Sequence, residues 1–352
     1  MKNKKRIESI DWLRGLMALS IMLYHLVGLT YFKLNADSLL GRLGVYGVCI
    51  FFILSGLSMA MVYSRYIKGI RTSFYFFIRR IFRIWPLLWV VTLLILINPV
   101  PFNQQGNSVI NIILNFTTTV GLIKPSDYIA MGTWSIGSEM LYYVFTPFII
   151  FLYNKKLLFG NLFFLFTILI GFYFSQILLK PTMNLGSQWQ IYINPLNNLY
   201  LYVSGIAIYY NLKKIKITKK LNIIVLLVCW ISFIILPFKG DQITLVTGIG
   251  RIIFSFLSIC IVISFYKMNF SVPKIIRYQL EVLGIATYSI YLFHPVVNVY
   301  VGIFLQKYFS LTNPIFQFIL AIISTIIISL ISYKYLEMPF MKLGKKVTKL
   351  KQ

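Results

Sequence analysis

The stretch DWLRGLMALSIMLYHL, residues 11–26, decides the fold class. Most of it is apolar, as a membrane-spanning helix requires, yet it contains Arg14 and His25. At about 100° per residue, the eleven steps between them make three turns and about 20°. Both side chains therefore lie on one helix face, about 16 Å apart along the axis. Because ionisable groups are costly at membrane depth, this pair predicts a functional site.

The composition of the whole chain agrees with a membrane protein. Of its 352 residues, 59% are hydrophobic and 12% are charged, and the mean hydropathy is +0.80. Runs of about twenty apolar residues predict an all-α integral membrane protein with about ten spans. We expect these spans at about 10–30, 44–64, 84–99, 134–153, 157–178, 196–211, 221–238, 243–265, 281–303 and 313–336.

Charged residues predict the orientation of the spans. The net charge is +26, and 27 of the 34 Lys and Arg residues fall on one side of the predicted spans or at its boundary. Such an excess is typical of the cytoplasmic side, so we expect both termini to be cytoplasmic. The charge is then explained by topology and by attraction to anionic lipid, and we expect no nucleic-acid partner.

Two parts of the chain have no predicted span. Residues 100–133 are too polar for a confident span, and we expect an interfacial or re-entrant piece over the outer side. The chain continues for only a few residues after the last span. We therefore expect one transmembrane domain over 1–340, a short basic cytoplasmic tail over 341–352, and no additional soluble domain.

Four ionisable residues are predicted to lie within spans: His25, Glu139, Arg251 and His294. Counting about 1.5 Å per residue from the expected edges places all four in the outer half of the membrane. A histidine and a carboxylate in one layer suit proton transfer, with His25 as the base and Glu139 orienting it. The two histidines lie on distant spans with one deep carboxylate, so we expect no metal site.

A second basic cluster, FFIRRIFRIWP, stands at the cytoplasmic start of the third span. Arg80 and Arg83 are three residues apart and share a helix face. Guanidinium groups bind phosphate in a bidentate manner, so this cluster and Arg14 predict a site for a phosphorylated ligand.

Each candidate also has a purely structural interpretation. The arginines of the third span can be membrane-surface anchors, and Arg14 can pair with Glu8 or Asp11. His25, Glu139 and Arg251 can be satisfied polar groups in the core, and His294 can support the helix break at Pro295. The sequence alone leaves these alternatives open.

Six motifs, in order along nearly the whole chain, resemble the membrane acyltransferase 3 family. RIESIDWLRGLMALSIMLYHL has the arginine and histidine with ten residues between them, GVYGVCIFFILSGLSM resembles the second span, and RRIFRIWP holds the Arg-x-x-Arg motif. TWSIGSEMLYYV, ATYSIYLFHP and YLEMPF resemble later motifs. Further candidates from these motifs are Trp134, Ser135, Tyr142, Tyr291, Glu337 and Pro339. The chain departs from the family at Gly137 and Met140, where larger or aromatic residues are common.

The resemblance implies a bacterial multi-pass enzyme of the cytoplasmic membrane. Its members transfer an acyl group, usually acetyl, from acyl-CoA to a hydroxyl of a cell-envelope glycan. We then expect Arg14, Arg80 and Arg83 to bind the CoA phosphates, and His25 with Glu139 to act in catalysis, either as general base or by receiving the acyl group. His294 and Arg251 are expected to support them. Expected partners are acyl-CoA, the glycan, the bilayer and glycan biosynthesis or export proteins. The alternative function is a polysaccharide exporter or flippase.

Overall fold

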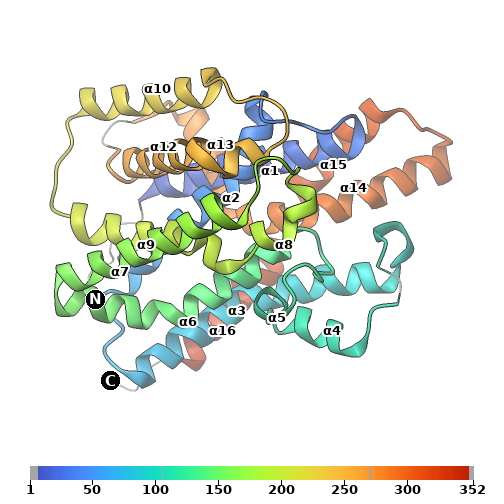
Figure 1. Ribbon diagram of the computed structural model, residues 1–352. Coiled ribbons are helices and arrows are strands. Elements are labelled where there is room, and N and C mark those ends of the chain that lie inside the picture. The colour runs from blue at the N-terminus through green and yellow to red at the C-terminus, as the bar shows by residue number, and fades with distance from the viewer. Residues whose placement is uncertain (1–6, 105, 269–270, 349–352) are drawn as a thin grey trace.

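The computed structural model describes residues 7–104, 106–268 and 271–348, and the regular structure within these ranges is helical throughout. Within these ranges, ten long helices lie side by side, with the α14–α15 turn and α4 at the right of Figure 1 and the start of α3 at the left. They are α1 (Glu8–Thr30), α2 (Leu39–Tyr63), α3 (Ile70–Ile97), α6 (Thr133–Lys155), α7 (Leu157–Tyr173), α9 (Pro195–Leu212), α10 (Lys219–Ile235), α12 (Gly248–Tyr266), α14 (Thr287–Phe309) and α15 (Pro314–Ser332).

Shorter elements connect or extend these helices. They are the 3₁₀ turns η1 (Val100–Phe102) and η3 (Gly186–Gln188), the π-helical turns η2 (Phe174–Leu178) and η4 (Tyr333–Glu337), and the helices α4 (Val109–Phe116), α5 (Val120–Ile123), α8 (Trp189–Tyr192), α11 (Ile243–Val246), α13 (Lys274–Ile285) and α16 (Met338–Val347).

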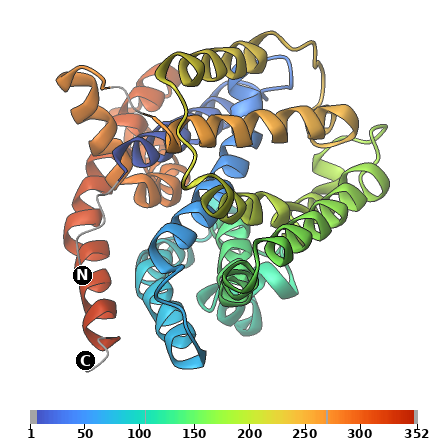
Figure 2. The same cartoon turned by 90° about the vertical axis from the view of Figure 1, so that its left-hand side faces the viewer.

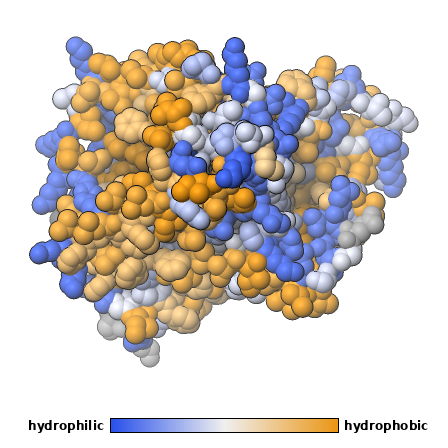
Figure 3. Space-filling model, viewed as in Figure 1, coloured by the Kyte–Doolittle hydropathy of each residue, from blue (hydrophilic) through white to orange (hydrophobic). Residues whose placement is uncertain are grey.

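Eight helical segments of the described ranges are long and apolar enough to cross a membrane. The remaining two long helices are α9 and α10, of which α10 has only 17 residues. Hydrophobic residues cover much of the face in Figure 3, and hydrophilic residues gather toward its left and right edges. The predicted all-α membrane class is confirmed. The number of spans and the side of the termini stay predictions.

Two long helices begin away from the predicted span edges. The third helix begins at Ile70, before the predicted span at residue 84, and it carries the arginine cluster on a helix as expected. At 28 residues, α3 is about 42 Å long, well over the thickness of a hydrocarbon core of about 30 Å, which lets its basic half extend beyond the apolar half. The ninth span begins at Thr287, and Glu281 lies on the separate helix α13.

The centre of the bundle is the contact between α2 and α9. A Cβ added at Gly56 would lie 1.9 Å from the Tyr202 carbonyl oxygen, and one at Gly205 would lie 2.0 Å from the Ile53 carbonyl oxygen. Small residues of this kind let two membrane helices approach until their backbones touch. Because α9 is buried almost all round, α2 is held firmly, and α2 supplies one wall of the site described below.

The predicted interfacial piece over 100–133 consists of short helices. Helix α4 exposes Val109, Ile110 and Ile113, an apolar edge suited to a lipid interface. Helix α5 lies on α6, where Gly121 and Gly137 meet: a Cβ on either would come within 2.7 Å of the other's backbone. This contact explains why position 137 holds glycine instead of a larger residue.

Residues 341–347 of the predicted tail belong to α16, which lies against α3. A Cβ at Gly344 would be 2.7 Å from the Phe82 Cβ, so the two helices are in close contact. Figure 2, which views the left-hand end of Figure 1, shows the C-terminal helices (red) along one edge of the bundle. The basic residues within 1–6 and 349–352, which we expect on the cytoplasmic side, lie outside the described residues.

Arg42 closes the end of α10. The guanidinium is 2% exposed and uses all five of its N–H donors. The acceptors are five backbone carbonyls, those of Ala36, Phe233, Ile234, Leu236 and Phe238, at 2.6–3.1 Å. Carbonyls at a helix C-terminus have no partner within the helix, and a cation there also complements the helix dipole.

Replacing Arg42 by lysine should destabilise the fold. A lysine has three donors, so at least two buried carbonyls lose a partner, at a cost of about 2–4 kcal/mol. We expect Arg42→Lys to lower the melting temperature of the detergent-purified protein by several degrees. Arg65→Lys, at an exposed position, is the matched control. Equal melting temperatures for the two variants would contradict this role.

Candidate active site

A cavity of about 530 Å³ lies between α1, α2, α3, α6, α14 and α16. This volume suits a small organic ligand. The predicted residues Arg14, Arg80, Arg83, Ser135, Glu139 and Tyr291 all line it. The exposed Lys345 also lines it, so the cavity reaches the protein surface at the α16 side.

The arginines of the cavity differ in how many hydrogen-bond and ion-pair partners they have within the protein. Arg14 pairs with Asp11 at 3.0 Å and also donates to Ser58 and to the Leu54 carbonyl. Arg80 donates to the Tyr63 hydroxyl at 2.9 Å, and its buried Nε has no partner among the described residues.

Arg83 has the weakest partner of the three, since it donates to the Met341 sulfur at 2.9 Å. In the described part of the chain, neither Arg80 nor Arg83 forms an ion pair with a carboxylate. A half-buried guanidinium that forms no ion pair favours an anionic ligand.

Glu139 also lines the cavity, beside Tyr143, whose ring lies 5.9 Å from the Arg80 guanidinium. The Glu139 Oε1 accepts hydrogen bonds from Ser55 and, at 2.5 Å, from the Tyr143 hydroxyl. Ser55 and Tyr143 are themselves 3.0 Å apart. Neither Ser55 nor Tyr143 was predicted as a site residue. Tyr143 was detectable as the residue one helical turn after Glu139, and Ser55 lies within the quoted second-span motif.

Tyr291 and Ser135 close the deep end of the cavity. Their hydroxyls are 2.8 Å apart, and the Tyr291 hydroxyl donates to the Gly132 carbonyl at 3.1 Å. Gly132 has a φ of +84°, and a Cβ there would lie 2.8 Å from the Tyr291 hydroxyl. Glycine is thus required both for this turn and for room beside the tyrosine.

The two histidines lie together, beyond Tyr291. The Nδ1 of His25 and the Nε2 of His294 are 2.9 Å apart, and the rings stack with centroids 5.1 Å apart. The Tyr291 ring is 6.2 Å from that of His294. Neither imidazole is among the residues that line the cavity. Tyr291 therefore stands between the cavity and the histidine pair.

Hydrogen bonds determine which ring nitrogen carries the proton in each histidine of the neutral pair. His294 Nδ1 is 3.0 Å from the Ile290 carbonyl, which can only accept, so Nδ1 carries the proton. His294 Nε2 is then an acceptor, and His25 Nδ1 donates to it. The Nε2 of His25 is left with a lone pair, which is the state a general base requires.

The predicted pairing of His25 with Glu139 is not what the structure shows. Among the described residues, Glu139 bonds to Ser55 and Tyr143 inside the cavity, whereas His25 bonds to His294 outside it. Arg251 is separate from both. Its guanidinium contacts the Asn197 carbonyl at 3.2 Å, the Asn198 Oδ1 at 2.9 Å and the Cys49 sulfur at 3.7 Å. Arg251 thus links α12, α9 and α2.

Three further candidates contact neighbouring helices and loops. Trp134 packs edge-on against Trp189, and the Tyr142 hydroxyl donates to the Pro195 carbonyl at 2.5 Å. Glu337 is buried on η4 and accepts from the Ser289 hydroxyl at 2.5 Å. These three contacts join α6, α14 and η4 to their neighbours, and the three residues do not line the cavity.

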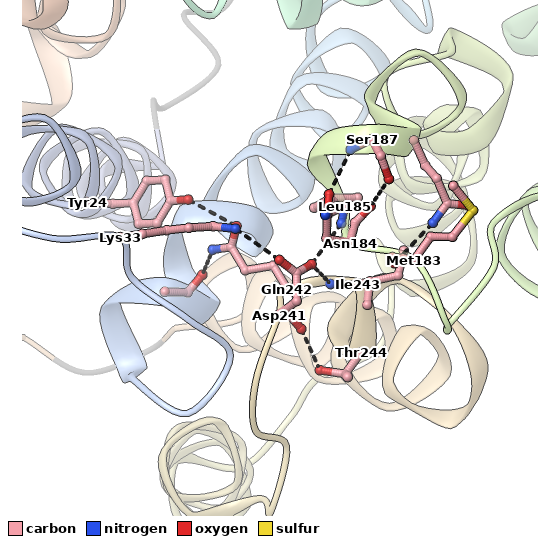
Figure 4. A network of polar contacts seen from close by, with 12 residues as sticks. Tyr24, Lys33, Met183, Asn184, Leu185, Ser187, Asp241, Gln242, Ile243 and Thr244 are labelled. Carbon is pink, nitrogen blue, oxygen red and sulfur yellow. Dashed lines mark hydrogen bonds and ion pairs between the residues drawn. The ribbon is translucent and has the colours of Figure 1, made fainter.

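Figure 4 shows a polar network that joins Tyr24 and Lys33 to the loop at Asp241. Tyr24, whose ring is 5.1 Å from that of His25, donates to Gln242 at 3.0 Å. The adjacent Asp241 accepts from the Leu185 and Ile243 amides at 2.8 and 3.0 Å and pairs with Lys33 at 3.0 Å. Burial alone raises the pKa of the Asp241 carboxyl, but these donors outweigh it and hold the pKa below its usual value.

No group of three His, Cys, Asp or Glu side chains in the described ranges could hold a metal ion. Residues 7–334 match the family model described as an acyltransferase domain. No solved structure matches the chain.

Curated relatives carry names that agree with the family match. Two are named O-acetyltransferase OatA, from Staphylococcus aureus strain NCTC 8325 / PS 47 and from strain COL. Each is 24% identical in an alignment of 374 residues, gaps included, that covers 98% of this chain and 59% of the relative. The chain thus spans about three-fifths of the length of these relatives.

The Asp241 network should weaken in acid. Because its folded pKa is below the unfolded value of about 3.9, its stabilising contribution is present above that pH and is lost as the pH falls through the folded pKa. We expect Asp241→Asn to melt at a lower temperature than wild type at pH 7, with the difference shrinking toward pH 3. Asp37→Asn, at an exposed position, is the control. A difference that does not change with pH would contradict this role of the carboxylate.

Proposed function

The chain belongs to the acyltransferase family whose domain it matches over residues 7–334, and from this premise we propose that it is a membrane-bound O-acyltransferase that uses acyl-CoA. The acyl group is most simply acetyl, as the names of the relatives suggest. The acceptor is a hydroxyl of a cell-envelope glycan, and the membrane is the bacterial plasma membrane. One observation carries the proposal: a cavity lined by two arginines that form no ion pair among the described residues reaches Tyr291, whose ring lies 6.2 Å from that of His294 in the histidine pair.

The donor enters at the end of the cavity that holds the arginines. Arg80 and Arg83 bind the diphosphate, with Arg14 beside them, because guanidinium groups match phosphate oxygens in charge and geometry. The thioester then points to the deep end, toward Ser135 and Tyr291. If the predicted topology holds, this entrance faces the cytoplasm, where acyl-CoA is made.

The acceptor reaches His25 from the other side. The hydroxyl proton moves to His25 Nε2 as the hydroxyl oxygen forms a bond to the thioester carbonyl carbon. The carbon–sulfur bond then breaks, the proton passes from His25 to the departing thiolate, and the products are CoA and the acylated glycan. Tyr291 must shift or be passed by the acyl group, because it separates the cavity from His25.

The donor step is tested with purified protein, radiolabelled acetyl-CoA and an envelope glycan. Wild type should transfer label to the glycan, and Arg83→Ala should raise the KM for acetyl-CoA about tenfold or more, because a charge-assisted phosphate contact is lost. Arg65→Ala is the control. Absence of transfer by wild type, with glycan export lost from cells that lack the protein, would instead support the exporter.

The histidine pair is tested by two substitutions at one position. His294→Phe keeps a ring but removes the acceptor for His25 Nδ1, so we expect kcat to fall about 10²-fold with the KM for acetyl-CoA unchanged. His294→Gln keeps both an acceptor and a donor and should recover much of this loss. If the two variants lose the same activity, His294 does not orient His25.

A further inference from the structure

Helix α16 forms part of the cavity wall and is held in place by Arg79. The Arg79 guanidinium donates from Nε to the Thr348 hydroxyl at 2.6 Å and from Nη2 to the Thr348 carbonyl at 3.2 Å. It also covers the Tyr66 ring at 4.7 Å. Arg79 thus stabilises the C-terminal end of α16, where unpaired carbonyls favour a cation. Its Nε and Nη2 groups are therefore engaged by the protein itself.

One face of α16 meets the cavity. Met341 and Lys345 are four residues apart, so they share a helix face, and both line the cavity. Met341 is the residue whose sulfur contacts Arg83. Lys342 and Lys346 are exposed on the same helix but do not line the cavity. The position of Gly344 against Phe82 fixes which face is turned inward.

The cations that line the cavity differ in burial. Arg80 and Arg83 are half-buried, whereas Lys345 is exposed at the entrance. Of the other cations that line the cavity, Arg14 is paired with Asp11 and Arg79 is engaged with Thr348. In the described part of the chain, Arg80, Arg83 and Lys345 form no ion pair with a carboxylate. This arrangement suits a ligand with one phosphate group inside and another at the entrance.

We infer that Lys345 binds the ribose 3′-phosphate of the donor, an inference that rests on the proposed use of acyl-CoA. In CoA the thioester arm is followed by the diphosphate and then by a ribose that carries a separate phosphate. Burial gives the lining residues the same order: Ser135 and Tyr291 are buried, Arg80 and Arg83 are half-buried, and Lys345 is exposed at the entrance. A lysine suits this position because a flexible ammonium can follow a partly solvated phosphate.

The inference is tested by measuring the affinity of the full-length purified protein for two probes, CoA and 3′-dephospho-CoA. Wild type should bind CoA more tightly than 3′-dephospho-CoA. Lys345→Ala should weaken CoA binding about fivefold, as an exposed charge contact allows, and should leave 3′-dephospho-CoA binding unchanged. Lys345→Arg should bind CoA nearly as wild type does. Lys346→Ala, on the same helix and equally exposed, should change neither affinity.

The outcomes separate this inference from the proposed function. If Lys345→Ala weakens both probes equally, or matches Lys346→Ala, then Lys345 does not bind the 3′-phosphate, while the use of acyl-CoA stands. If wild type binds neither probe, the donor itself is wrong and the inference fails with it.

Discussion

A guanidinium buried among apolar helices must find its partners within the protein, because the surrounding lipid offers none. Arg42 meets this constraint fully, with five donors on five carbonyls. Arg251 meets it in part, through an amide, a carbonyl and a thiol. Arg83 differs from both: it is half-buried beside a cavity that reaches the surface, and its hydrogen-bond acceptor among the described residues is a thioether. The number of donors that find a protein acceptor therefore separates arginines that hold helices together from arginines available to bind an anion. Residue type alone does not make this distinction.

The same constraint divides the site into two compartments. On one side is a cavity lined by cations and by the Glu139–Ser55–Tyr143 cluster. On the other is a histidine pair whose protons are ordered by the Ile290 carbonyl. The Tyr291–Ser135 contact lies between them, and Gly132 gives it room. A donor and an acceptor that approach from opposite sides of a membrane would meet at this contact.

The sequence predicted how deep each residue lies along its helix. It did not predict which neighbour a side chain contacts, because that depends on the rotation of the helix about its axis. Apolar runs located all ten long helices, and the rise per residue placed His25 and His294 at similar depth. Depth does not specify which faces meet, so Glu139 was paired with His25, whereas the structure turns it toward Ser55 and Tyr143. Helix α3 begins before the predicted span because hydropathy detects only the apolar part of a helix and not its amphipathic extension. Lys345 was assigned to a tail because only the packing of Gly344 on Phe82 reveals that α16 returns to the cavity.

The central claim is that His25 performs acyl transfer to a glycan, and it is tested most directly in cells. Wild type and His25→Ala are produced at matched levels in the membrane, and O-acyl groups on the envelope glycan are measured by mass spectrometry. Loss of the acyl groups with the amount of surface glycan unchanged is the predicted result. Unchanged acylation in His25→Ala would contradict the role of the histidine, and loss of surface glycan itself, with no acyl groups in either strain, would contradict the transferase.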